Sequence, residues 1–308
     1  MLPFPSFSFE APDRLEEALS LLRTPGSLPV AGGTDLLPSM KHRLFTPELV
    51  VSLKRIPAMR SVEHRSDGTL ALGAMLTLRE VSRLAAVQDH YAALAAACGT
   101  IATPTIQTMG TLGGNVMLDT RCMYYNQPAG WRGALGFCLK KDGTRCHVAP
   151  KGNGCYAAHS ADTVPSLWQY GASLEVASAD GPREIAIRDL YADDGLVRHV
   201  LTPGTLVTRI LLPPPRGRVV HRKLRARGAI DYALLLVAVA GETGRLTAVL
   251  SAIGPRPIEV EGSTPEALAE AAFKASQPLS THLQPSTWRK RMVRVEVRRA
   301  AEQLLTAG

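Results

Sequence analysis

Two glycine-rich turns constrain this 308-residue chain more than any other feature. The first turn consists of Ala31, Gly32, Gly33, Thr34, Asp35 and Leu36, and the second spans 108–115, TMGTLGGN. Glycine lets the backbone approach phosphate oxygens closely, and successive exposed N–H groups form an anion-binding nest. Thr34, Thr111 and Asn115 add side-chain donors. Together, the two turns can hold the two phosphates of a dinucleotide from opposite sides.

Neither turn matches a standard nucleotide motif. There is no Gly-x-Gly-x-x-Gly fingerprint, and no Gly-Lys-Ser/Thr of a P-loop. A single Gly-Gly pair usually marks only a turn. The residues alone therefore predict a phosphate site and nothing more specific.

Short helices and strands are predicted around these turns. A helix over 11–24 and strands over 28–30 and 47–53 surround the first turn. A strand at 69–74 precedes a helix that starts with a capping box of Thr77 and Glu80, and a second helix ends before Pro104. A strand and prolines close this region near 215.

The C-terminal part predicts antiparallel strands around a helix-like apolar segment near 233–240. Two helices follow over 263–275 and 287–305. Helical spacing places Trp288, Met292, Val295 and Arg299 on one flank of the last helix, which we expect to lie on a sheet.

Composition narrows the class of protein. The chain carries a formal charge of +8, with basic residues concentrated near 216–227 and 288–299. Aromatic residues do not alternate with these basic residues, so we expect a solvated or subunit-facing basic surface and no nucleic-acid binding. The longest apolar run, 233–240, is too short to span a membrane, and the N-terminus does not resemble a secretory signal. We therefore expect a cytoplasmic protein with two or three domains.

Residues 119–157 interrupt the pattern, because they are rich in Gly, Cys and charge and show little periodicity. A structureless stretch of this length needs something to order it. The segment holds four of the five cysteines, Cys122, Cys138, Cys146 and Cys155, whereas Cys98 lies in an apolar helix and is expected to be a core residue. Clustered cysteines in a cytoplasmic chain predict a metal site or catalytic sulfur in preference to disulfides. The irregular spacing leaves zinc and iron–sulfur equally open, with His147 as a substitute ligand.

A family resemblance makes these expectations specific. The strings PVAGGTDL, LGAMLTLREV, IATPTIQTMGTLGGNV, HSADTVPSLWQYGA and HRKLRARGAIDYALLLVAVAG occur in order along the chain. They resemble segments of the medium, FAD-binding subunits of the xanthine dehydrogenase and carbon monoxide dehydrogenase group. The resemblance implies an α+β chain with a two-subdomain PCMH-type FAD-binding fold and a C-terminal CO dehydrogenase flavoprotein-type domain. The implied boundaries are 1–57, 58–215 with the cysteine insertion at about 119–157, and 216–308.

The resemblance also implies a set of FAD-binding residues. Ala31, Gly32, Gly33, Thr34, Asp35 and Leu36 in the first turn and Thr111, Gly113, Gly114 and Asn115 in the second would hold the pyrophosphate and ribose. Further implied contacts are Thr77, Ala102, Met109, Asp162 and Lys223. For Asp162 the residues leave an alternative open, since it also stands where a helix N-cap is expected before VPSLWQY.

A flavin subunit with a cysteine insertion is similar to the β subunits of 4-hydroxybenzoyl-CoA reductases. The resemblance implies a [4Fe-4S] cluster on the four inserted cysteines and no catalytic acid or base on this chain. It implies a molybdenum-cofactor large subunit, a small subunit with two [2Fe-2S] clusters, a ferredoxin donor and a dimer of heterotrimers. Electrons would run from the donor through this chain to molybdenum, to dehydroxylate 4-hydroxybenzoyl-CoA reductively.

Other functions stay open at this point. An oxidative molybdenum hydroxylase on another substrate would use the cysteine insertion as an electron exit or a structural metal site. A stand-alone FAD oxidase would need a substrate base, and we can nominate none. A zinc-stabilised module without catalysis would leave both glycine turns unexplained.

Overall fold

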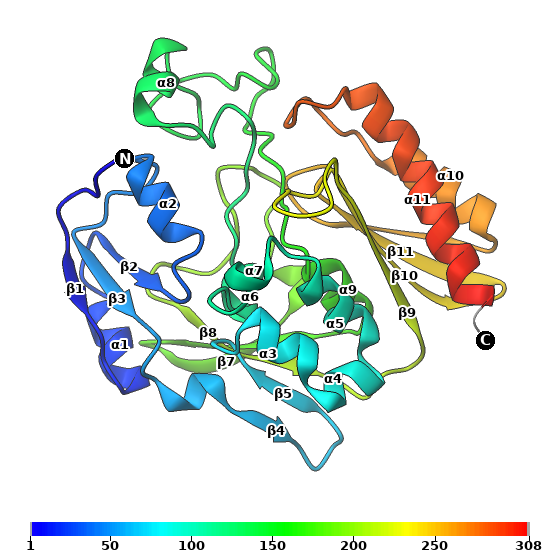
Figure 1. Ribbon diagram of the computed structural model, residues 1–308, viewed down its shortest axis with the longest axis horizontal. Helices are drawn as coiled ribbons and strands as arrows, with labels where there is room; N and C mark the ends of the chain where they lie inside the picture. The colour runs from blue at the N-terminus through cyan, green and yellow to red at the C-terminus, as the bar shows by residue number, and fades with distance from the viewer. Residues whose placement is uncertain (1, 307–308) are drawn as a thin grey trace.

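The computed structural model describes residues 2–306, and three β-sheets succeed one another along this part of the chain (Figure 1). The first is parallel, in the order β1-β3-β2, with β1 at Ser8–Glu10, β2 at Ser27–Val30 and β3 at Leu49–Ser52. The helices α1 (Leu15–Leu21) and α2 (Leu36–Lys41) connect these strands, as parallel pairing requires. The predicted helix and strands before residue 57 are confirmed, although α1 is shorter than 11–24.

The second sheet has five antiparallel strands in the order β4-β5-β8-β6-β7. Its strands are β4 (Val62–His64), β5 (Leu70–Gly73), β6 (Ser173–Ser178), β7 (Gly181–Ala186) and β8 (Leu206–Leu212). Its helices are η1 (Pro57–Arg60), α3 (Leu78–Arg83), α4 (Ala85–His90), α5 (Ala92–Gly99), α6 (Pro104–Gln107), α7 (Leu112–Val116), α9 (Val164–Gln169) and η2 (Ile187–Asp189). The strand β5 precedes the second glycine turn, and β6, β7 and β8 of the same sheet follow the cysteine insertion. Both features therefore lie in the connection between two strands of one sheet.

The capping box at the start of α3 is confirmed. The Thr77 hydroxyl accepts the N–H of Glu80 at 3.1 Å, and Glu80 accepts the N–H of Thr77 at 2.7 Å. The predicted helices after it are more broken than expected. Extended backbone at Leu84 separates α3 from α4, and α5 already ends at Gly99.

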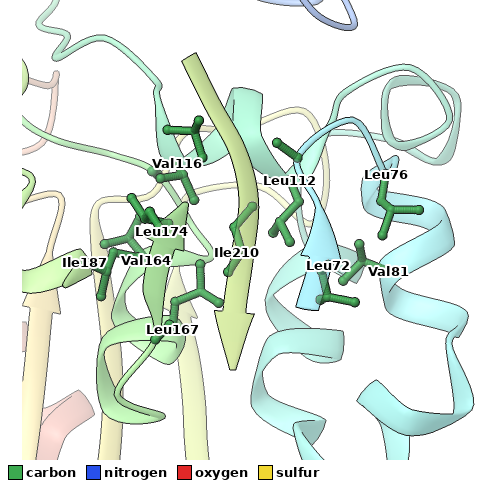
Figure 2. Packing of buried hydrophobic residues seen from close by; sticks show 14 of the residues in the cluster. Leu72, Leu76, Val81, Leu112, Val116, Val164, Leu167, Leu174, Ile187 and Ile210 are labelled. Atoms are coloured by element: carbon green, nitrogen blue, oxygen red, sulfur yellow. The ribbon is translucent and has the colours of Figure 1, made fainter. Parts of the chain in front are cut away.

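The main core lies between this sheet and its helices (Figure 2). Leu72, Leu174 and Ile210 of the strands meet Leu112 and Leu167 of the helices, and all five are buried. Burying each such side chain contributes about 1.5–3 kcal/mol. Cys98 belongs to the same core, as the sequence predicted.

The third sheet is antiparallel, in the order β12-β11-β10-β9, and α10 and α11 cover one face (Figure 1). Its strands are β9 (Val219–Leu224), β10 (Leu235–Glu242), β11 (Arg245–Ser251) and β12 (Ile258–Gly262), and its helices α10 (Pro265–Ala275) and α11 (Ser286–Thr306). The prediction of a helix-like segment near 233–240 is therefore wrong, because the strand β10 occupies most of it. Val237 and Val239 face the helices while Ala238 joins the main core, so burial on both sides hides the strand's alternation.

The last helix lies on the sheet as predicted, through a face other than the flank of Trp288, Met292, Val295 and Arg299. Val293, Val297 and Ala301 are buried, whereas Trp288 is 39% exposed. The inward face includes a fully buried arginine, Arg289, which a pattern of apolar residues does not reveal. Among residues 2–306, no helix combines the length and apolar character that crossing a membrane requires.

Residues 119–157 contain one short helix, α8 (Ala129–Ala134), which stands away from the sheets at the top of Figure 1. The ends of this insertion are tied together where the backbones of Arg121 and Ala158 exchange hydrogen bonds of 2.9 and 2.7 Å. The insertion thus leaves and returns at one point. The proposed domain boundaries at 57 and 215 stay a prediction.

Candidate functional site

The two glycine-rich turns lie in direct contact. A Cβ atom on Gly32 would stand 1.8 Å from the carbonyl oxygen of Met109 and 3.1 Å from the Cα of Gly110. No side chain fits in that space, so only glycine allows the first turn to pass this close to the second. The sequence predicted two turns that act together, and the fold brings them together.

Hydrogen bonds fix the shape of the second turn. The hydroxyl of Thr111 accepts the N–H of Gly114 at 3.0 Å and caps α7. The side-chain oxygen of Asn115 accepts the N–H and hydroxyl of Thr163 at 3.1 and 2.7 Å. The Gly110 carbonyl accepts the N–H of Leu78 at 2.8 Å. The Thr111 hydroxyl and the side-chain oxygen of Asn115 thus stabilise the conformation of the turn.

A cavity of about 530 Å³ opens beside the contact between the turns, within the usual range for ligand sites. The predicted residues on its wall are Ala31, Gly32, Thr77, Met109 and Thr111.

Sequence reasoning missed the basic residues of this wall. Lys54, Arg60, Arg79 and Arg83 line it, with Glu80 as their acidic neighbour. Burial opposes ionisation of Glu80, but hydrogen bonds from Thr77 and the charge of Arg60, 2.7 Å away, hold its pKa below the usual value. The cavity therefore carries net positive charge and suits an anionic ligand. These cations belong to no common motif, so the linear sequence gave no signal for them.

A second hollow of about 290 Å³ adjoins the first turn. Phe4, Phe7 and Phe9 line it together with Ala31 and Gly32, which also belong to the wall of the larger cavity. An apolar surface thus continues beyond the basic one, and no motif in the sequence predicts it.

Asp162 and Lys223 form a buried ion pair. Lys223 also donates to the carbonyl of Thr100 at 3.2 Å. Burial raises the pKa of Asp162, and the opposing charge of Lys223 offsets only part of that rise. Asp162 is not a helix N-cap, since Thr163 takes the N-cap position of α9 without a side-chain cap. The alternative role considered from the sequence is therefore wrong.

Ala102 lies two residues after Thr100, whose carbonyl Lys223 contacts, and has an unusual conformation. Its φ is 45°, and its carbonyl accepts the N–H of Ile230, whose φ is 53°. A positive φ is rare for a β-branched residue such as isoleucine and often marks a functional turn. The wall of the 530 Å³ cavity does not include Ala102, Asp162 or Lys223.

The four inserted cysteines share one neighbourhood. Burial raises the pKa of Cys122, and the charges of Cys138 and Cys146 raise it further. Burial raises the pKa of Cys155 to about 11, with added contributions from Cys122 and Cys146 and a lowering effect of Lys140. The thiols are thus within electrostatic reach of one another, as a shared site requires.

The cysteines do not form a ready site for a single ion. Within residues 2–306, no three His, Cys, Asp or Glu side chains converge to hold one metal ion. Nε2 of His147 bonds to the carbonyl of Phe137, and its ring lies 5.4 Å from that of Tyr124. In a cubane cluster each cysteine binds a different iron, so its ligands stand farther apart than those of one ion. Four cysteine thiolates are the type of ligand that such a cluster takes, and the cluster itself stays a prediction.

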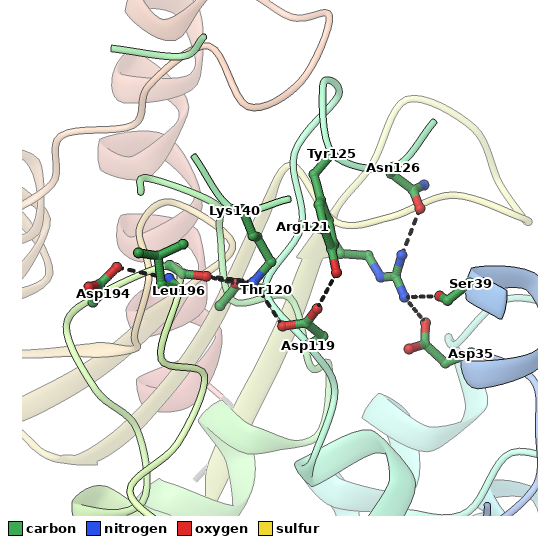
Figure 3. A network of polar contacts seen from close by, with 11 residues as sticks. Asp35, Ser39, Asp119, Thr120, Arg121, Tyr125, Asn126, Lys140, Asp194 and Leu196 are labelled. Atoms are coloured by element: carbon green, nitrogen blue, oxygen red, sulfur yellow. Dashed lines mark hydrogen bonds and ion pairs between the residues drawn. The ribbon is translucent and has the colours of Figure 1, made fainter. Parts of the chain in front are cut away.

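Buried polar contacts hold the insertion against the body of the protein (Figure 3). Within the insertion, Lys140 pairs with Asp119 at 2.9 Å, and Tyr125 donates to the same carboxylate at 3.0 Å. Lys140 also donates to the carbonyl of Gly195, outside the insertion, at 2.5 Å. On the other side, Arg121 pairs with Asp35 of the first glycine turn. The cysteine insertion and the turn are therefore parts of one connected structure.

Comparison with known proteins identifies the class. Residues 5–215 match the family described as the FAD binding domain in molybdopterin dehydrogenase, and the chain belongs to that family. It is an FAD-binding subunit of the molybdenum hydroxylase type.

Individual relatives agree with that class. The chain is 30% identical over 259 residues to the aldehyde oxidoreductase FAD-binding subunit PaoB of Escherichia coli K12, covering 80% of this chain and 81% of the relative. It is 28% identical over 321 residues to the carbon monoxide dehydrogenase medium chain of Afipia carboxidovorans, covering 97% and 96%. Quinoline 2-oxidoreductase of Pseudomonas putida 86 shares the fold, with a TM-score of 0.77, 21% identity and 98% coverage of both chains. The expected α+β flavoprotein fold is confirmed.

Proposed function

We propose that the paired glycine turns hold the pyrophosphate of FAD. The observation that carries this proposal is the contact of Gly32 with Met109, beside a cavity with a basic wall. Backbone N–H groups at such a contact and nearby cations both favour an anion. The proposed contacts are Ala31, Gly32, Gly33, Thr34, Asp35, Leu36, Thr77, Ala102, Met109, Thr111, Gly113, Gly114, Asn115, Asp162 and Lys223.

The role we propose for the chain is electron transfer within a larger enzyme. Its relatives are named as an FAD-binding subunit and a medium chain, which supports partner subunits. The partners proposed are a molybdenum-cofactor large subunit and a small subunit with two [2Fe-2S] clusters. Bound FAD would exchange electrons with them, and this chain's residues would position it and exclude water.

We further propose that Cys122, Cys138, Cys146 and Cys155 bind a [4Fe-4S] cluster. Their common neighbourhood and the anchored ends of the insertion support this. Burial raises the pKa of Cys155, and the charge of Lys140 offsets part of that rise, toward the thiolate form that iron requires. Binding of a cluster would also offset the entropy cost of ordering the insertion, residues 119–157.

The cysteine proposal is tested by iron and sulfide analysis with a visible spectrum. Serine at each of the four inserted positions should lower the iron content, while Cys98→Ser, in the apolar core, should leave it unchanged. Full iron in one of the four variants would require another ligand, and His147 would be replaced next.

We propose that the complex oxidises its substrate and that the cysteine insertion provides an exit for electrons. The names aldehyde oxidoreductase and carbon monoxide dehydrogenase support this direction. Reductive dehydroxylation of 4-hydroxybenzoyl-CoA with a ferredoxin donor is the second candidate, supported by the cysteine insertion. Cluster potentials range over roughly −700 to +450 mV, so both directions are chemically accessible.

A redox titration followed by EPR and flavin absorbance separates the two directions. A cluster potential above the two-electron FAD couple supports the exit, because electrons then pass from flavin to cluster. A potential well below it would contradict the oxidative proposal and support the reductase.

A further inference from the structure

Arg121 lies where the cysteine insertion begins, directly before Cys122. Its backbone is fixed by the two hydrogen bonds with Ala158, and its side chain is 7% exposed. Its position is therefore set by the closed base of the insertion, where Cys122 follows it directly and Cys155 lies three residues before Ala158. The guanidinium reaches away from this base toward the first glycine turn (Figure 3).

One guanidinium contacts three segments. Nη2 pairs with the carboxylate of Asp35 and donates to the hydroxyl of Ser39 at 3.0 Å, while Nη1 donates to the side-chain oxygen of Asn126 at 2.6 Å. Asp35 belongs to the first turn, Ser39 to α2 and Asn126 to the insertion. The planar fork of arginine makes such simultaneous contacts, which the ammonium of lysine cannot reproduce.

Within residues 2–306, Asp35 forms its ion pair with Arg121. Asp35 stands two residues after Gly33, whose φ is 73°, and directly before α2. A turn with two adjacent glycines has many accessible conformations, so a fixed contact at its end reduces the entropy lost when a ligand binds.

We propose that Arg121 is a positioning residue for the flavin site, which holds the first glycine-rich turn in its binding conformation through Asp35. This inference rests on the proposed function, in which that turn holds FAD. The cysteine insertion then has a second role besides its thiols, because its base serves as a support for the turn. This role does not require a metal at the cysteines.

The test measures FAD affinity by flavin fluorescence on protein from which flavin has been removed. Arg121→Met should weaken FAD binding about tenfold or more, as expected for loss of charge-assisted hydrogen bonds. Asp35→Asn should act similarly, and the double variant should be no weaker than the worse single variant, because both remove one interaction. Arg121→Lys should restore part of the affinity.

Two matched variants separate positioning from general damage. Arg294→Met removes an exposed 2.7 Å contact with Glu270 on the far helices and should leave FAD affinity unchanged. Arg298→Met removes an exposed 3.4 Å contact with Glu302 on the same last helix and should also leave FAD affinity unchanged. Circular dichroism confirms folding in each variant.

Three results would overturn the inference: unchanged FAD affinity in Arg121→Met, additive effects of Arg121→Met and Asp35→Asn, or an equal loss of FAD affinity in Arg294→Met. Unmodified protein that does not bind FAD would instead refute the proposed function.

Discussion

Removing Lys223 should destabilise the fold strongly. Lys223→Met keeps the length of the side chain but leaves Asp162, 7% exposed, without the cation that it pairs with. Taking one partner from a buried pair costs about 3–5 kcal/mol, because the remaining charge is uncompensated. For a chain of this size we expect the melting temperature to fall by about 5–10 °C.

The size of this effect should depend on pH. Asp162 has a raised pKa even beside Lys223, because burial penalises its charge, and losing Lys223 raises the pKa further. A raised carboxylate pKa means that the protonated form is the better tolerated one in the fold. The destabilisation should therefore be greatest above this raised pKa and decrease as the pH falls through it and Asp162 takes up a proton.

The assay is thermal unfolding across pH, with and without saturating FAD. Measurements without FAD separate loss of the ion pair from loss of bound flavin. The double variant Asp162→Asn/Lys223→Met should recover much of the stability, since it no longer buries a charge. If Lys223→Met melted like the unmodified protein at neutral pH, or if the double variant were the less stable, the reasoning would be refuted.

Three further predictions follow from single contacts. Gly32→Val should yield flavin-free protein by absorbance, because its Cβ would stand 1.8 Å from the Met109 oxygen, and retained flavin would contradict this. Arg289→Met should lower the melting temperature, because the buried guanidinium donates to the carbonyls of Leu234, Leu279 and Ala252, and an unchanged value would refute a structural role. Burial lowers the pKa of His159 to about 3, so stability should fall as the pH drops from about 6.5, where the unfolded chain begins to bind the proton, and His159→Gln should reduce that loss in denaturant titrations.

Local chemistry made part of this structure predictable. The capping box at Thr77 involves residues only three positions apart. The two turns are recognisable from their adjacent glycines, which favour turn conformations. The strand β10 was mistaken for a helix because it is buried on both faces, which removes the alternation that identifies a strand. Arg289 was missed for a related reason, since a buried charge contradicts the apolar pattern by which an inward face is recognised.

The links between distant segments could not be predicted from the sequence. Arg121 and Asp35 lie 86 positions apart, and neither is unusual in its local sequence. Only the fold brings the insertion's base to the first glycine turn. The insertion can therefore both support the first glycine turn through Arg121 and present its cysteines to a metal. The residues at the base are held by backbone pairing and the buried contact of Arg121 with Asp35, whereas Cys138 and Cys146 lie farther along the insertion than Cys122 and Cys155. Loss of a bound metal should therefore loosen the segment around Cys138 and Cys146 first, and the support of the flavin turn should persist.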